Sequence, residues 1–214
     1  MVYNMRYRFK ESDLTSEKSL WDVYVLSRKI LPNRFQVIFV ICSMSLLAIN
    51  AFALNPNKAY LLHSVRRWAD FGFNFSVTTL GFLIAGFTIF ATISKPTMML
   101  AMMDHVHKAS GLPTLKYNFF AFIGVFISYL FFSAVYLMII LLGEPGGVFA
   151  SLAYRLPASE CVVDAAAKVG YVIVGGSLIS LLLSLKSFVF NTYATVMNFL
   201  RWEYHEMHNN DQNS

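Results

Sequence analysis

Two groups of metal-binding side chains are the residues of this chain with the clearest capacity for chemistry. His105 and His107 follow a cluster of methionines, and thioether and imidazole groups together are ligands for copper. The second group carries carboxylates and imidazoles at three- and four-residue spacing near the C-terminus: Glu203, His205, Glu206 and His208. His-x-His on a helix points its rings to different sides and no thiolate completes the first site, while a solvated polar helix end explains the second. We therefore expect no metal and no other cofactor.

Catalytic groups are missing where a membrane enzyme would need them. The long apolar runs contain no Asp, Glu, His or Arg before Lys186. Proton-coupled carriers mark their route with ionisable residues inside the membrane, and an enzyme needs an acid, a base, a nucleophile or a metal ligand. The longest loop, residues 144–168, shows no nucleophile with an adjacent base. The sequence therefore favours a protein that is not an enzyme.

Small and hydroxylated residues recur in the second and fourth apolar runs. Small residues let helices approach closely, and hydroxyl groups form hydrogen bonds across the contact. The serines of the fourth run share one helical face at three- and four-residue spacing. We select as candidates for helix packing, for an oligomer contact or for a mildly polar pore lining Gly81, Ala85, Gly86, Ser177, Ser180 and Ser184.

Four methionines define a second candidate surface. Met98, Met99, Met102 and Met103 fall on one face of a helix that begins at Pro96. Methionine is flexible and polarizable, so a methionine-rich face suits the docking of a protein partner. The alternative is that this face packs within the same chain or on the bilayer surface.

The elements that must position these residues are membrane-spanning helices. The chain has 214 residues, of which 57% are hydrophobic and only 14% are charged. Since about 20 apolar residues cross a bilayer, we predict four spans at about 35–54, 71–94, 117–142 and 169–188. The breaks between them coincide with Asn55-Pro56, Lys95-Pro96 and the glycine-rich segment after Leu142. The predicted fold is all-α and polytopic, with a transmembrane domain over residues 35–204.

The distribution of basic residues predicts the orientation. Seven of the seventeen Lys and Arg residues precede Phe35, and placing both termini inside puts twelve of them on the cytoplasmic side and five outside. The positive-inside rule favours this arrangement. We therefore expect a multi-pass protein of the cell inner membrane with cytoplasmic N- and C-termini.

Helices outside the lipid are expected on the cytoplasmic side. Residues 1–34 form an amphipathic segment with an interfacial helix near 15–31, and the fourth span continues past Lys186 as a helical extension. Residues 205–214 are polar and are predicted to be a disordered tail. The basic N-terminal segment lies next to the first span, so anionic lipid is its partner and direct nucleic acid binding is not expected.

One stretch of the second span resembles a known group of proteins. Residues Gly81 to Ile93, followed by Lys95-Pro96, resemble small four-pass bacterial inner-membrane proteins encoded in antiphage-defence operons, such as the membrane subunit of the Kiwa system. The resemblance covers about fifteen residues and the layout of the spans. It implies a bacterial inner membrane, a homo-oligomer and a cytoplasmic effector as partner, and it supplies no catalytic residues.

These observations lead to two functional hypotheses. The first is a non-enzymatic, oligomeric membrane scaffold or sensor that recruits or regulates a cytoplasmic protein, in the setting of antiphage defence that the resemblance implies. The alternative is an oligomeric ion channel or a pore that depolarises the membrane, for which the serine face of the fourth span is the candidate lining. The sequence leaves both open.

Overall fold

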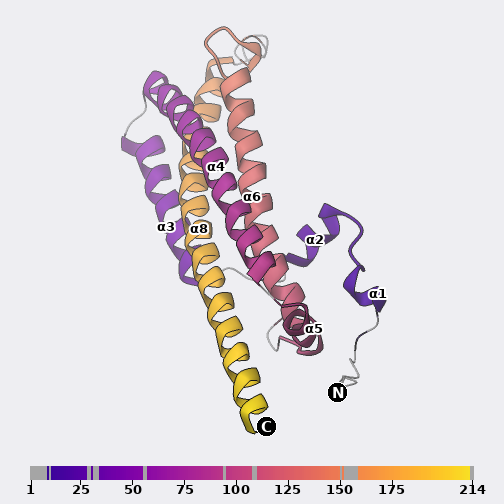
Figure 1. Cartoon of the computed structure of the whole chain (residues 1–214). Coiled ribbons are helices and arrows are strands. Elements are labelled where there is room, and N and C mark those ends of the chain that lie inside the picture. Colours follow the sequence, from indigo (N-terminus) through magenta and orange to yellow (C-terminus); the bar gives the residue numbers. More distant parts are fainter. Residues whose placement is uncertain are drawn as a thin grey trace. The chain divides into compact units, whose positions relative to one another are not determined.

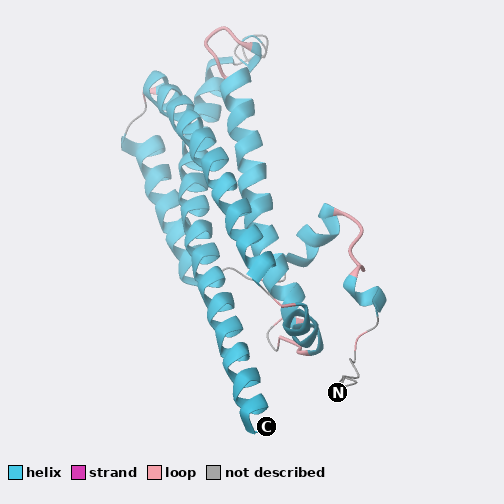
Figure 2. Ribbon diagram, in the orientation of Figure 1, coloured by secondary structure: helices cyan, strands magenta, loops and turns pink. Residues whose placement is uncertain are grey.

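A computed structural model shows an all-helical chain (Figures 1 and 2). It describes residues 9, 11–27, 30, 34–54, 57–93, 95–107, 110–149, 151 and 159–212. Across these residues the only β pairing is an isolated antiparallel bridge between Val106 and Pro113. The elements are α1 (Glu11–Leu14), α2 (Leu20–Ser27), α3 (Arg34–Ile49), the π-helix η1 (Asn50–Leu54), α4 (Lys58–Ile93), α5 (Pro96–Asp104), α6 (Thr114–Leu142) and α8 (Ser159–Gln212).

The predicted fold class is confirmed at the level of helices and spans. Helices that are long and apolar enough to cross a membrane number four in the described chain: Arg34–Leu54, Lys58–Ile89, Thr114–Leu142 and Glu160–His205. The chain is therefore a multi-pass membrane protein by the length and composition of its helices. Asn55, Pro56 and Ser94, which we used to place span ends, lie outside the described residues.

Two compact units divide the chain. Unit 1 contains residues 1–31, 82–127 and 186–214, and unit 2 contains residues 32–81 and 128–185. Helices α4, α6 and α8 each contribute one part to each unit. The predicted pore and packing residues Ser177, Ser180, Ser184 and Gly81 belong to unit 2, whereas the methionine face belongs to unit 1.

The second span is longer at its N-terminal end than predicted. We expected a span from Phe71, but α4 is one helix of 36 residues from Lys58. Asn57 begins it, because its side-chain oxygen accepts hydrogen bonds from the backbone N–H groups of Ala59 and Tyr60. A helix of this length rises about 54 Å, more than the ~30 Å of the hydrocarbon layer, so part of α4 must lie outside it.

Proline and glycine end the helices where the sequence indicated. Pro96 occupies the first turn of α5, where its missing N–H costs nothing. After α5 a tight loop returns the chain to α6: Thr114 donates its backbone N–H to His105 O at 2.8 Å, and Gly111 adopts φ 69°. That left-handed conformation favours glycine. Helix α6 then ends at Leu142, directly before Gly143.

The N-terminal segment forms two short helices rather than one. We predicted a helix near 15–31, and the structure begins α2 at Leu20. Ser19 and Asp22 explain this start, because Asp22 donates its N–H to Ser19 Oγ while its carboxylate accepts the N–H of Ser19. This reciprocal pair is a capping box. Residues 28, 29 and 31 of the predicted helix lie outside the described residues.

Helix α8 extends beyond the predicted span in both directions. It runs for 54 residues, from Ser159 to Gln212. Residues 205–212, which we expected to begin a disordered tail, are therefore helical, and residues 213–214 lie outside the described part. Once a helix is nucleated, each added residue gains a backbone hydrogen bond, so polar residues can extend an existing helix that they would not start.

Candidate interaction surfaces

Two buried tyrosines of α6 occupy the interior of unit 2. Tyr129 and Tyr136 are both 0% exposed. The Tyr129 hydroxyl donates to Leu181 O at 2.7 Å, and the Tyr136 hydroxyl lies 2.7 Å from Ser177 Oγ. Ser177 Oγ donates its own hydrogen to Val174 O at 2.8 Å, so Tyr136 is the donor in the pair. Both tyrosines thus attach α6 to α8, and the sequence analysis did not select either of them.

Close helix contacts in unit 2 form at three glycines. A Cβ atom built on Gly72 would lie 2.7 Å from the ring of Tyr136. The same construction gives 2.7 Å to Leu47 at Gly175 and 2.6 Å to Met44 at Gly176. These distances are shorter than a van der Waals contact, so a larger residue at any of the three positions would force the neighbouring side chain to move.

Gly81, Ala85 and Gly86, the small residues selected from the second span, do not lie at these close contacts of unit 2. Gly81 has no atom within 4 Å of a built Cβ, and Ala85 is exposed. Gly86 lies in unit 1, where a built Cβ would be 3.3 Å from the ring of Phe188. Of the two glycines, Gly86 is the one that lies against another helix of its unit. The sequence does not rank the glycines, since all of them lie in equally apolar runs.

The three serines of the fourth span do not share one surface. Ser177 is 7% exposed and bonded to Tyr136 in the interior. Ser180 and Ser184 instead line a surface hollow of about 190 Å³ between α3 and α8. The hollow is lined by Gln36, Val37, Val40, Ile41, Ser180, Leu183 and Ser184. Ser184 Oγ donates to Ser180 O at 2.9 Å, so its hydrogen is already used within the helix.

Gln36 is a polar residue that the sequence analysis overlooked. Its side-chain amide donates to Leu183 O at 3.1 Å and joins α3 to α8. An amide group near the start of an apolar run is the signal that could have identified it, because an unpaired amide in lipid is costly. Among described residues of unit 2, Asn50 has a similar role, donating to the hydroxyl of Tyr171 at 2.9 Å.

Charged and aromatic side chains lie near the N-terminal part of α4 and the C-terminal end of α6 in unit 2. Arg66 Nε donates to Gly143 O at 2.6 Å. The rings of Trp68 and Tyr171 are 4.5 Å apart between centroids, and Lys168 pairs with Asp164 at 2.7 Å. Aromatic rings with Lys and Arg are typical of the membrane–water interface. Arg66 therefore has a structural partner, the free carbonyl after the last turn of α6.

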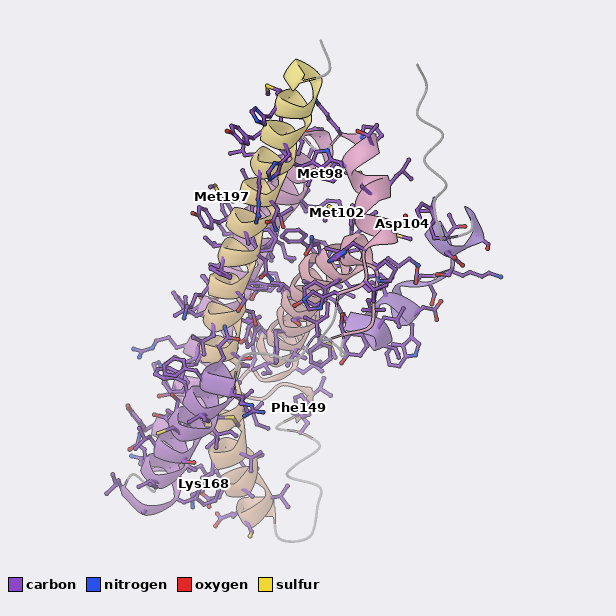
Figure 3. The ribbon with its side chains drawn as sticks, turned by 90° about the horizontal axis from the view of Figure 1, so that it is seen from below. Met98, Met102, Asp104, Phe149, Lys168 and Met197 are labelled. Carbon is purple, nitrogen blue, oxygen red and sulfur yellow. The ribbon has the colours of Figure 1, made fainter. Side chains whose placement is uncertain are left out.

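The methionine face is only partly accessible. Met98 is 4% exposed and Met103 is 2% exposed, whereas Met99 and Met102 are half-buried. On a helix with 3.6 residues per turn, Met99 and Met102 lie between the other two around the axis. Figure 3 shows the side chains of α5 with Met98 and Met102 labelled. Met98 and Met103 are thus packed inside their unit. Only Met99 and Met102 are accessible enough to contribute to a docking surface.

An ion pair attaches the start of α5 to α8 within unit 1. Lys95 Nζ lies 2.6 Å from Glu203 Oε1, and the two side chains are 47% and 23% exposed. Glu203 Oε2 is buried and has no hydrogen-bond partner in the described part of the chain. Glu203 therefore holds α5 to α8, so one carboxylate of the C-terminal group of Glu and His residues has a cationic partner.

The candidate metal ligands are dispersed. Across the described residues no three His, Cys, Asp or Glu side chains are placed to share an ion. His107 stacks on Tyr117 with ring centroids 4.0 Å apart, and its Nδ1 lies 3.1 Å from Ser110 Oγ. It thus supports the loop between α5 and α6.

The N-terminal segment is attached to α6 in unit 1. Lys116 Nζ is 2.8 Å from Glu17 Oε1 and 2.6 Å from Ser16 Oγ. Burial raises the pKa of Glu17, but the hydrogen bonds from Lys116 and Ser16 outweigh it, so the pKa is lowered from its ordinary value. Trp21 of α2 is 69% exposed, as expected for a ring that inserts into the headgroup layer of a membrane.

An apolar face of α8 in unit 1 is exposed. It is formed by Phe190, Tyr193, Met197, Leu200, Tyr204 and Met207, and Val189 and Trp202 are exposed on this part of the helix as well. The opposite face carries Phe188 and Thr195, which are 3% and 4% exposed. In Figure 3 Met197 is labelled on one side of α8 and Met98 on the other. This part of α8 therefore has two apolar faces, of which one is buried in its unit.

Comparison with known proteins does not assign this chain to a family. No family model, curated protein or solved structure is similar to it at a significant level.

Proposed function

We propose that this chain is a non-enzymatic membrane scaffold that self-associates and holds a cytoplasmic protein partner against the bilayer. The observation that carries the proposal is the length and surface of α8. The helix has 54 residues, and it exposes Met197, Leu200, Tyr204 and Met207 beyond the ~20 residues that lipid can cover. Large apolar side chains exposed outside lipid mark protein interaction surfaces.

The proposed orientation places unit 1 at the cytoplasmic face. It follows from the seven Lys and Arg residues before Phe35, which bring the total on the cytoplasmic side to twelve against five outside. The inner membrane is the proposed location, with both termini in the cytoplasm. In this arrangement α5, with Met99 and Met102 half-buried, lies on the side from which a soluble partner would approach.

The interior of unit 2 favours a scaffold over a pore through one chain. Tyr129 and Tyr136 fill the space between α6 and α8, and the Ser177 hydroxyl is engaged by both Tyr136 and Val174. A channel of the kind we considered would therefore need to form between copies. The resemblance of residues 81–93 to membrane subunits of antiphage-defence operons supplies a setting for the proposal, in which the partner is a cytoplasmic effector.

Site-specific photo-crosslinking tests this function. A photoreactive amino acid is placed at Met99 or Met102 of the full chain, expressed from its own promoter in its own host, and the matched control is Ile38 of α3, which is 65% exposed. We expect the α5 positions to give an adduct with a soluble protein, identified by mass spectrometry, and Ile38 to give none because it faces lipid.

Two results would contradict the proposal. The first is an adduct pattern at Met99 and Met102 that does not differ from the pattern at Ile38. The second is a chain that migrates as a monomer in mild detergent and in nanodiscs, since a scaffold of this kind needs more than one copy.

A further inference from the structure

We propose that the exposed face of α8, formed by Phe190, Tyr193, Met197, Leu200, Tyr204 and Met207, is a parallel coiled-coil seam for a second copy of this chain. We call it the α8 seam. The inference rests on the proposed function, whose self-association it assigns to a surface.

Spacing is the first argument for the seam. Its six members follow one another at intervals of three, four, three, four and three residues. Alternation of three and four is the heptad pattern, in which every member faces a neighbouring helix when two helices supercoil. The exposed fractions are 66%, 60%, 46%, 52%, 67% and 57% in chain order. No member of the pattern is covered by its own unit, although Phe188 and Thr195 of the same helix are buried.

Lipid does not explain the full length of the seam. From Val169 a span of ~20 residues ends near Phe188, which precedes the first member of the seam. Arg201 and Glu203 lie within the seam's length, and Glu203 pairs with Lys95 at 2.6 Å. Ionised side chains of this kind are rare in hydrocarbon. The C-terminal half of the seam therefore lies outside lipid, where exposed leucine, methionine and tyrosine need a protein partner.

Membrane insertion favours a second copy as that partner. All copies inserted in one bilayer with the same topology have the same orientation and depth, so identical seams meet in parallel and in register. In a parallel pair, residues beside the seam meet those five positions further on in the other helix. Val196 then meets Arg201, and Glu203 meets His208, so no like charges are brought together.

The area of the seam fits a stable association. Side chains of this size carry roughly 200 Å² each, and the exposed fractions then amount to about 700 Å² per copy. A specific interface buries about 800 Å² per partner, so the seam alone approaches that size.

Cysteine crosslinking in membranes tests the seam. The background is the full chain with Cys42→Ala and Cys161→Ser, because both native cysteines are exposed. Single cysteines replace Met197 or Leu200 in the seam, and Asn198 or His205, which are exposed on other faces of α8, serve as matched controls. A disulfide needs Cα atoms about 4.4–6.8 Å apart, which facing positions of an in-register pair satisfy. Under mild oxidation we expect several-fold more dimer from Met197→Cys and Leu200→Cys than from either control.

The outcomes separate the seam from the general proposal. Equal crosslinking at seam and control positions, or crosslinks from the seam to a different protein only, would overturn the seam as a contact between copies. If seam positions fail to crosslink while the chain is still oligomeric in nanodiscs, the seam is refuted and the scaffold stands. If the chain is also monomeric there, both proposals fail. Leu200→Glu provides a second measurement: it should reduce the oligomer mass, whereas Asn198→Glu should not.

Discussion

The hydrogen bond between Tyr136 and Ser177 gives the sharpest prediction about the interior. Ser177 Oγ donates to Val174 O at 2.8 Å and accepts from Tyr136, whose hydroxyl lies at 2.7 Å. The two partners are therefore unequal. Tyr136→Phe removes the donor and leaves Ser177 still bonded to its own helix. Ser177→Ala removes the acceptor and leaves a tyrosine hydroxyl buried at 0% exposure without a partner.

The magnitudes follow from this asymmetry. Hydrogen bonds between helices in membranes contribute about 0.6 kcal/mol on average and up to ~1.7 kcal/mol. We expect Tyr136→Phe to lower the free energy of unfolding by about 0.5–1 kcal/mol. Leaving a buried polar group unpaired costs about 1–3 kcal/mol, so Ser177→Ala should cost more. In the double variant the unpaired hydroxyl is absent, so its cost should fall below the sum of the single costs by ~1 kcal/mol.

Reversible unfolding in mixed detergent micelles measures these differences. Ser184→Ala is the matched control, because the Ser184 hydroxyl bonds only within α8 and lines the surface hollow; its cost should stay below ~0.5 kcal/mol. The reasoning is refuted if Ser177→Ala costs no more than Tyr136→Phe, or if the two costs add. A Ser177 that faced water in a pore would tolerate alanine at almost no cost, so the same series separates the packed interior from a channel lining.

Three further predictions concern other contacts. Gly72→Ala should destabilise the chain by about 1–3 kcal/mol because its Cβ would meet the Tyr136 ring at 2.7 Å, whereas Gly81→Ala, with nothing within 4 Å, should be neutral or slightly stabilising in the same unfolding assay. The lowered pKa of Glu17 means that its pairing with Lys116 adds stability above the ordinary carboxyl pKa and is lost as pH falls through the lowered value. The hydrogen-exchange protection factors of residues 19–27, which correct for the slower intrinsic exchange of amides in acid, should therefore fall on acidification in the wild type. They should fall much less in Glu17→Gln, where protection is already lower at neutral pH. Met103→Glu should reduce thermal stability because Met103 is 2% exposed, whereas Met99→Glu should leave stability unchanged and abolish recovery of a partner; equal effects of the two substitutions would contradict the packing of α5.

The spans could be predicted from the sequence because lipid imposes a single requirement on them. A helix in hydrocarbon must pair every backbone group internally and must be apolar for about 20 residues, and both properties are local. The breaks at Pro96 and Gly143 are local as well. Proline lacks a backbone N–H donor, and glycine adopts the backbone conformations that end a helix. The continuity of α4 from Lys58 into the span is different, although Asn57 begins the helix through a local contact. Arg66 lies in that helix with Gly143 O as its partner, and Gly143 is far away in the sequence.

The candidate site residues were only partly predictable for a related reason. An apolar residue in a span looks the same in the sequence whether its side chain faces another helix or a fatty acid chain. Gly72, Gly81 and Gly176 therefore look equivalent in the sequence, and the contact that distinguishes them is a neighbouring ring or side chain from another helix. Spacing likewise placed Ser177, Ser180 and Ser184 on one face. In the structure Ser177 is hydrogen-bonded to Tyr136, whereas Ser180 and Ser184 line a surface hollow.

The part of α8 after Lys186 shows that a hydrophobic sequence pattern can be misleading outside lipid. Its residues from Phe188 to Tyr204 include large apolar side chains on two faces, and a sequence of this kind suggests a longer span. Burial separates the two faces: Phe188 and Thr195 are covered by unit 1, while the members of the α8 seam are exposed. A helix with two apolar faces is explained by two protein contacts as well as by lipid. Because Glu203 is held there by Lys95, the protein explanation is favoured for the C-terminal half, and the second contact is the one that we propose for another copy of the chain.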